Sequence, residues 1–116
     1  MWSDPTVDFI KKPESHSSIN HAYHLYPLQI DFEKLPITKP EFFDKMKLVG
    51  INLQVHYIPV HLQPFYRKLG FQEGNFPEAE AYGREAISLP LYPDLTDDKQ
   101  NRVIATLKDF IECELL

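Results

Sequence analysis

The sequence predicts an α/β fold, with a small mixed or antiparallel sheet, helices packed on one face, and the order β-α-β-α-β-α. Stretches rich in β-branched and aromatic residues alternate along the chain with stretches whose apolar residues recur every three or four positions. The chain has 116 residues, of which 43% are hydrophobic, enough for one domain with one core. Because helices cover only one face of such a sheet, we expect the other face to present an apolar surface to a partner.

The first strand is predicted within residues 21–32 (HAYHLYPLQIDF), where aromatic and branched apolar residues roughly alternate with others. Pro27 has no amide proton to donate, so it indicates a bulge or an edge position. Residues 1–20 contain two prolines and a serine-rich run, and we expect them to lead into the domain rather than form part of it. The domain then comprises residues 21–116.

A helix and a second strand are predicted next. Thr38 or Lys39 is placed to cap the helix, Pro40 fits its first turn, and Gly50 provides the stop. Residues 51–56 alternate between apolar and polar side chains, which predicts a half-buried strand.

The second half of the chain predicts a short helical turn at residues 65–69, a helix at 77–86, a short strand at 87–89 and a last helix that begins after Thr96. The apolar residues of the last helix recur at helical spacing and form one stripe: Val103, Ile104, Leu107, Phe110 and Ile111.

The loop after the second strand, VHYIPVHLQPFY, concentrates groups that can bind a ligand. Its two prolines exclude a central strand or a helix interior, so we predict a stiff, extended loop. Stiff loops on a rigid scaffold hold polar groups in place, and this one carries His56, Tyr57 and His61. The alternative is that its aromatic residues pack the domain while its histidines face water.

Composition argues against several functions. The net charge of −5 leaves no basic stripe for nucleic acid. No apolar run is long enough to span a bilayer, and no charged and apolar leader is present, so neither a membrane nor secretion is indicated. The single cysteine, Cys113, fits a reducing cytoplasm, and we expect an inert thiol. Two pairs of histidines are close in sequence, His21 with His24 and His56 with His61. No cysteines or converging carboxylates accompany them, so we expect no metal site.

Four ordered motifs carry a resemblance to a known family: HAYHLYPLQID, KLVGI, QVHYIPVHLQPFYRKLGF and FPEAEAYGREAISLPLYPDLTDD. Over residues 23–107 the chain resembles the C-terminal small domain of the DegT/DnrJ/StrS sugar-nucleotide aminotransferases. These are pyridoxal-phosphate enzymes of the aspartate-aminotransferase fold type. Within the family, the motifs resemble the branch that aminates 4-keto-6-deoxy nucleotide sugars, including the pseudaminic-acid pathway transaminase.

The resemblance implies a parent enzyme of polysaccharide biosynthesis that acts as a dimer and takes its amino group from glutamate. It also implies that the loop lies at the mouth of the active site, so that His56, Tyr57 and His61 contact the nucleotide sugar. Imidazole and phenol groups can donate to sugar hydroxyls and phosphate oxygens, which is compatible with that role.

The resemblance assigns the Schiff-base lysine, the acidic partner of the pyridinium nitrogen and the phosphate cradle to a large N-terminal domain. No lysine here lies in such a context, and only four glycines are present. We therefore expect no catalytic residue and no bound pyridoxal phosphate in this chain alone, with the large domain, the nucleotide sugar and a second copy as partners. The alternative is a free-standing binding or assembly module that uses the bare face of its sheet.

Overall fold

The computed structural model describes residues 8–115 and confirms the predicted class. Three strands form an antiparallel sheet in the order β1-β2-β3, with β1 at Ile10–Lys11, β2 at Pro27–Ile30 and β3 at Ala86–Ser88. In register, Ile10 pairs with Ile30, and Leu28 pairs with Ile87.

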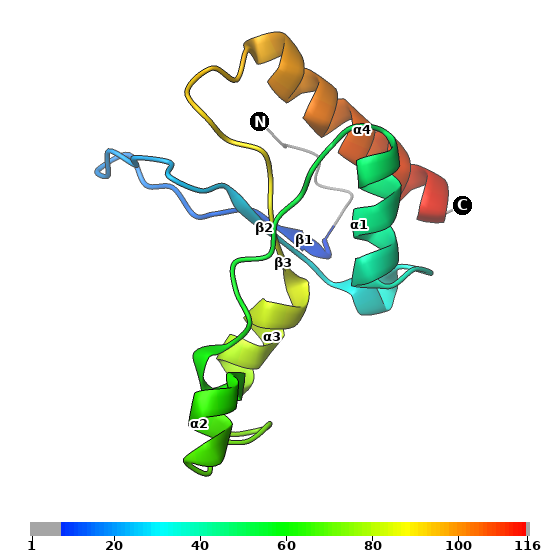
Figure 1. Ribbon diagram of the computed structural model, residues 1–116. Coiled ribbons are helices and arrows are strands. Elements are labelled where there is room, and N and C mark those ends of the chain that lie inside the picture. Colours follow the sequence, from blue (N-terminus) through cyan, green and yellow to red (C-terminus); the bar gives the residue numbers. More distant parts are fainter. Residues whose placement is uncertain (1–7, 116) are drawn as a thin grey trace.

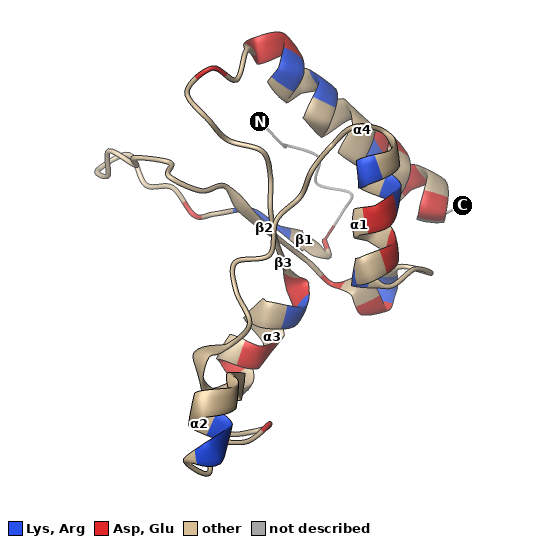
Figure 2. Ribbon diagram, in the orientation of Figure 1, with Lys and Arg blue, Asp and Glu red and all other residues tan. Residues whose placement is uncertain are grey.

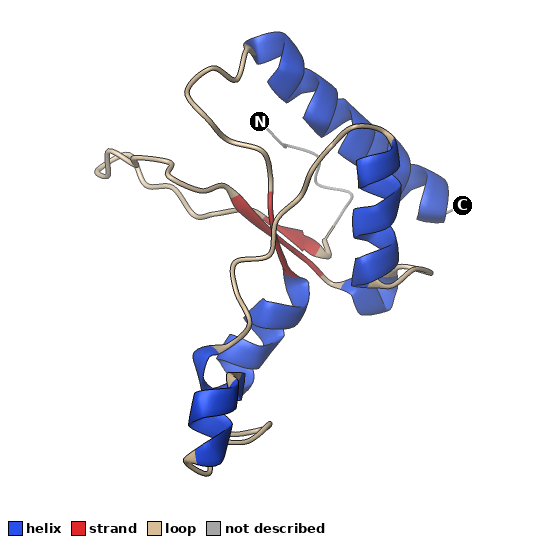
Figure 3. Ribbon diagram, viewed as in Figure 1, coloured by secondary structure: helices blue, strands red, loops and turns tan. Residues whose placement is uncertain are grey.

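Helices flank the sheet in two groups (Figures 1 and 3). The helices are α1 (Lys39–Leu48), α2 (Pro64–Lys68), α3 (Pro77–Glu85) and α4 (Asp97–Leu115), with short 3-10 turns η1 (Phe32–Lys34) and η2 (Val60–Leu62). α1 and α4 lie together on one side of the strands, whereas α2 and α3 form a projection on the other side. We call residues 57–85, which make this projection, the arm. The radius of gyration is 15.8 Å, against about 13 Å for a compact domain of this size, because both the arm and the connection between β1 and β2 project from the sheet (Figure 1).

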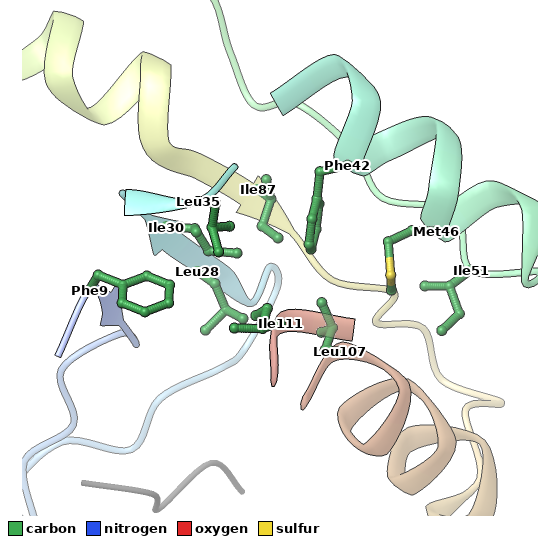
Figure 4. Close-up of a cluster of buried hydrophobic side chains, with 10 residues drawn as sticks. All are labelled: Phe9, Leu28, Ile30, Leu35, Phe42, Met46, Ile51, Ile87, Leu107 and Ile111. Carbon is green, nitrogen blue, oxygen red and sulfur yellow. The ribbon is translucent and has the colours of Figure 1, made fainter. Parts of the chain in front are cut away.

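The core lies between the sheet and the pair α1 and α4 (Figure 4). Side chains from four elements meet there, each at most 2% exposed: Leu28, Ile30, Phe42, Met46, Ile87, Leu107 and Ile111. Fully burying one such side chain stabilises a fold by about 1.5–3 kcal/mol. The rings of Phe32 and Phe110 pack edge-on against Phe42, with centroids 5.6 and 5.4 Å away. The helical stripe predicted for the last helix therefore faces the core.

The ends of α1 follow from local chemistry. Thr38, rather than Lys39, is the N-cap: its backbone N–H donates to Glu41 Oε2 at 2.7 Å, and its hydroxyl accepts from the Glu41 amide at 3.4 Å. The Thr38 backbone N–H and, at 2.9 Å, the Thr38 hydroxyl both donate to Glu41 Oε2, and these two hydrogen bonds lower the pKa of the Glu41 carboxyl. At the other end, Gly50 adopts a φ of 83°, which glycine tolerates without strain. The predicted start and stop are both confirmed.

Two predicted boundaries were wrong. Residues 1–20 do not all precede the domain, because Ile10–Lys11 pairs with β2 and Phe9 is 8% exposed within the core. A two-residue strand is too short to show a periodic pattern, so only pairing reveals it. The strand predicted at residues 51–56 is reduced to one bridge, in which Gln54 and Ser88 exchange backbone hydrogen bonds of 3.1 and 2.8 Å.

The apolar surface predicted for the bare face of the sheet lies elsewhere. On that face Gln29 donates to Glu85 at 3.2 Å, and Ser88 hydrogen-bonds to His56, so its side chains are largely polar. Exposed large apolar side chains gather instead on the arm: Tyr57, Ile58, Val60, Phe65, Tyr66, Leu69, Phe71, Phe76 and Tyr82. No helix in the described part of the chain is long and apolar enough to cross a membrane.

Candidate functional site

His56 is held at the base of the arm, where the chain leaves the sheet. Its Nδ1 lies 2.9 Å from Ser88 Oγ, and Ser88 is only 4% exposed. Ser88 is fixed in turn by its backbone pairing with Gln54. Because Ser88, the hydrogen-bond partner of the ring, is itself held at the sheet edge, the scaffold sets the orientation of the imidazole.

Tyr57 begins the arm and points its ring outward. The side chain is 71% exposed, and its ring centroid lies 4.7 Å from that of His56 at an angle of 64°. The peptide bond between the two residues is cis. A phenol can donate to or accept from a hydroxyl or phosphate oxygen, and its ring can lie against an apolar face of a ligand. The pair therefore presents a binding edge to solvent.

His61 lies inside the arm. Only 6% of the residue is exposed, its Nε2 is 2.7 Å from Glu80 Oε1, and its ring packs edge-on against Phe76 at 4.9 Å. The expected contact between His61 and substrate does not fit this placement, since η2 turns the ring toward α3. Of the three residues predicted for the site, the structure brings only His56 and Tyr57 together where a ligand can reach them.

Glu80 ties His61 to the tip of the arm. Both carboxylate oxygens accept from the Gly74 amide, at 2.8 and 3.1 Å. The hydrogen bond with His61, followed by those with the Gly74 and Phe76 amides, lowers the pKa of the Glu80 carboxyl, while desolvation opposes the shift. Gly83 lets the loop approach α3: a Cβ there would lie 2.9 Å from the ring of Pro59. These contacts fix the path of the loop after Tyr57.

A groove of about 550 Å³ borders His56 and is lined by parts of residues 50–56 and 88–95 and by the start of α4. Its polar and charged lining residues are Asn52, Gln54, His56, Ser88, Tyr92, Lys99 and Arg102. Arg102 Nη2 donates to the Val49 carbonyl at 2.9 Å, which anchors the guanidinium at one edge.

The side chains present do not fit a resident pyridoxal-phosphate site. Such a site needs an amine for a Schiff base and a carboxylate for the pyridinium nitrogen. Of the side chains that the structure describes along the groove, that of Lys99 alone carries an amine and none carries a carboxylate. Lys39, whose pKa is lowered by burial, donates to the Gly83 and Ala86 carbonyls at 3.0 and 2.7 Å and so performs a structural task. Among the described residues, no three His, Cys, Asp or Glu side chains converge to hold a metal ion.

Comparison with known proteins gives the family. The model of the DegT/DnrJ/EryC1/StrS aminotransferase family matches residues 5–108. The chain belongs to this family. The assignment agrees with the resemblance carried by the four motifs.

Curated relatives are much longer than this chain. It is 42% identical over 100 residues to the uncharacterized protein MJ1066 of Methanocaldococcus jannaschii, covering 85% of this chain and 26% of the relative. It is 40% identical over 102 residues to the spore coat polysaccharide biosynthesis protein SpsC of Bacillus subtilis, covering 86% of this chain and 26% of SpsC. The chain thus spans about a quarter of the length of these relatives.

Solved structures share the fold. DesV from S. venezuelae, determined with a ketimine intermediate, aligns with a TM-score of 0.79 and 28% identity over 93% of this chain and 28% of DesV. PseC from Helicobacter pylori, an aminotransferase involved in the biosynthesis of pseudoaminic acid, aligns with a TM-score of 0.68 and 26% identity over 78% of this chain and 24% of PseC.

Sequence reasoning missed several residues of this region. Ser88 and Gln54 were assigned only to strands, and Glu80 only to the helix at residues 77–86. Lys99 and Arg102 did carry a signal, because cations three positions apart share one face of a helix. No pattern among neighbouring residues in the sequence indicates that this face of the helix borders a groove.

Proposed function

We propose that this chain is the C-terminal small domain of a pyridoxal-phosphate-dependent sugar-nucleotide aminotransferase, and that it contributes substrate-facing residues rather than catalytic ones. One observation carries the proposal: the family model covers nearly the whole chain, while the chain covers about a quarter of its relatives. The remaining length of such relatives is where a large cofactor-binding domain fits. We further propose a 4-keto-6-deoxy nucleotide sugar as substrate and glutamate as amino donor.

Within this proposal, the residues of the loop divide their tasks. Tyr57 contacts the sugar or its phosphates through the phenol hydroxyl, and His56 contacts the same ligand through the imidazole nitrogen that does not face Ser88. His61 is a positioning residue, because its hydrogen bond to Glu80 holds the loop against α3. The cofactor and its lysine belong to the large domain, since the groove beside His56 lacks the required carboxylate.

A chimera tests the proposal. This chain would replace the matching quarter of Helicobacter pylori PseC, and transamination of a nucleotide sugar would be measured. We expect an active chimera in which Tyr57→Phe lowers kcat/KM about tenfold, the effect of losing one hydrogen bond of about 1.4 kcal/mol. His24→Ala, at an exposed position outside the site, is the matched control and should leave kcat/KM unchanged.

The isolated chain provides a second measurement. Mixed with pyridoxal phosphate, it should give no absorbance band that responds to an amino donor, because it lacks a cofactor site. Such a band, or a Tyr57→Phe chimera with unaltered kcat/KM, would contradict the assignment of roles made here.

The exposed apolar side chains of the arm favour a second candidate, a free-standing binding or assembly module. The two candidates predict different neighbouring DNA. An open reading frame that encodes a lysine-bearing domain next to this one supports the aminotransferase domain. A stable oligomer of the chain alone, measured by light scattering, together with the absence of such a frame, supports the module.

A further inference from the structure

The groove beside His56 has a charge opposite to that of the chain. The protein carries a net charge of −5, yet among residues 8–115 the Lys, Arg, Asp and Glu side chains that line the groove are Lys99 and Arg102, both cationic. Figure 2 shows basic segments following the acidic start of α4. The groove lining is thus basic although Asp97 and Asp98 begin α4 just before Lys99, and cations that face a groove favour an anionic ligand there.

The two cations are placed to act together. Lys99 and Arg102 are three positions apart in α4, so their side chains leave the same face of the helix. Both residues are largely exposed, but Arg102 is anchored by its bond to the Val49 carbonyl. A guanidinium has five N–H donors, so this bond leaves others for a ligand. An ammonium and an anchored guanidinium can each donate hydrogen bonds to the oxygens of one phosphate of a diphosphate.

The rest of the lining suits a nucleotide or a sugar. Asn52 and Gln54 are exposed on the extended segment that borders the groove, and their amides can both donate and accept hydrogen bonds. Tyr92, 46% exposed, also lines the groove and offers an aromatic ring. A volume of about 550 Å³ is within the range of small-molecule sites.

We propose that this groove binds the diphosphate of a nucleotide sugar, with Lys99 and Arg102 as the anion contacts and Tyr92 as a surface for the base. The inference rests on the proposed function, because His56 lines the groove and also borders Tyr57, so that one ligand can extend from the cations to the loop. It adds a specificity role for α4 that neither the motifs nor the comparisons assign.

The test is a titration of the full 116-residue chain, labelled with ¹⁵N, with uridine diphosphate, inorganic pyrophosphate and uridine. We expect saturable shifts of the Ser88 and Lys99 amides with the two diphosphates, weaker at high salt, and much smaller shifts with uridine at the same concentration. The double variant Lys99→Glu/Arg102→Glu should raise the Kd for uridine diphosphate at least tenfold.

The matched control is Lys47→Glu/Lys68→Glu, which changes net charge equally at exposed positions outside the groove and should alter Kd less than twofold. Lys99→Glu alone leaves the contact between Arg102 and Val49 in place and should still weaken binding about threefold. Equal losses in both double variants, shifts confined to other surfaces, or no saturable shift would each overturn the proposal.

The outcomes separate this inference from the proposed function. Binding of uridine diphosphate in the groove, with unaltered turnover in the Tyr57→Phe chimera, would refute the loop assignment and support the groove. Absence of binding, with turnover reduced by Tyr57→Phe, would refute the groove and leave the proposed function standing.

Discussion

The half of the molecule that contains the sheet, α1 and α4 differs from the arm in what holds it together. In the half that contains the sheet, apolar side chains from the strands, α1 and α4 are removed almost completely from water. In the arm, the ordering contacts are the bonds of Glu80 to His61 and Gly74, together with a row of aromatic neighbours that includes Phe71 and Phe76, with ring centroids 6.1 Å apart.

The difference indicates which side of the molecule meets another surface. The half that contains the sheet buries its own apolar side chains, and this burial stabilises the native fold. The arm leaves large apolar side chains in water, an arrangement typical of an interaction site. The candidate ligand residues His56 and Tyr57 lie at the junction of the two regions, where a rigid scaffold joins an exposed projection.

The largest contrast is expected from one aromatic truncation in each region. Phe42→Ala should lower the free energy of unfolding by about 3–5 kcal/mol, because Phe42 is 0% exposed and its removal leaves a cavity. Phe65→Ala, at a side chain 66% exposed on the arm, should change it by less than about 0.5 kcal/mol. Urea unfolding followed by circular dichroism measures both. Equal effects would show that the arm contributes to the same core.

A smaller effect is expected where the two regions are joined. Lys39 in α1 reaches two carbonyls at the end of α3, and Lys39→Met removes both hydrogen bonds. The free energy of unfolding should fall by about 1–2 kcal/mol, the scale of hydrogen bonds from a charged donor that is only partly buried. Lys47→Met, at an exposed position of the same helix, is the control and should be near neutral in the same urea experiment. If Lys39→Met changes the free energy of unfolding no more than this control does, the link between the two regions does not stabilise the fold.

The smallest effect concerns the acid sensitivity of the arm. The pKa of Glu80 is lowered in the folded chain from its ordinary value of 4.5, first by the hydrogen bond with His61. The ionised carboxylate therefore stabilises the arm fully above about pH 4.5, and this contribution is lost as the pH falls through the lowered folded pKa. The amide shift of Gly74, followed by NMR from pH 6 to pH 2, should titrate with a midpoint below 4.5.

Two variants complete that titration. Glu80→Gln should abolish the Gly74 transition, since the amide then faces a group that does not ionise. Glu78→Gln, at an exposed position in the same helix, should leave the midpoint in place. A Gly74 midpoint at or above 4.5 would mean that His61 and Gly74 do not favour the ionised carboxylate.

Much of the fold could be predicted because its signals are local. The cap at Thr38, the stop at Gly50 and the stripe of the last helix depend on neighbours within a few positions, and all three are confirmed. β1 was missed because two residues carry no period, and the strand at 51–56 was overestimated because alternation does not show whether a partner strand is long enough. In the candidate site, the loop could be located from the sequence but the inward turn of His61 could not, and contact of His56 and Tyr57 with a substrate stays a prediction.

The sequence by itself determined the family, the positions of the helices and of β2 and β3, and the loop that carries His56 and Tyr57, because ordered motifs and short-range patterns survive without knowledge of contacts. Only the tertiary structure decided that exposed apolar side chains gather on the arm, that Glu80 hydrogen-bonds to His61, and that Lys99 and Arg102 border the same groove as His56. These features join residues 19 to 46 positions apart, and such distances are set by packing between elements rather than by the pattern within any one of them.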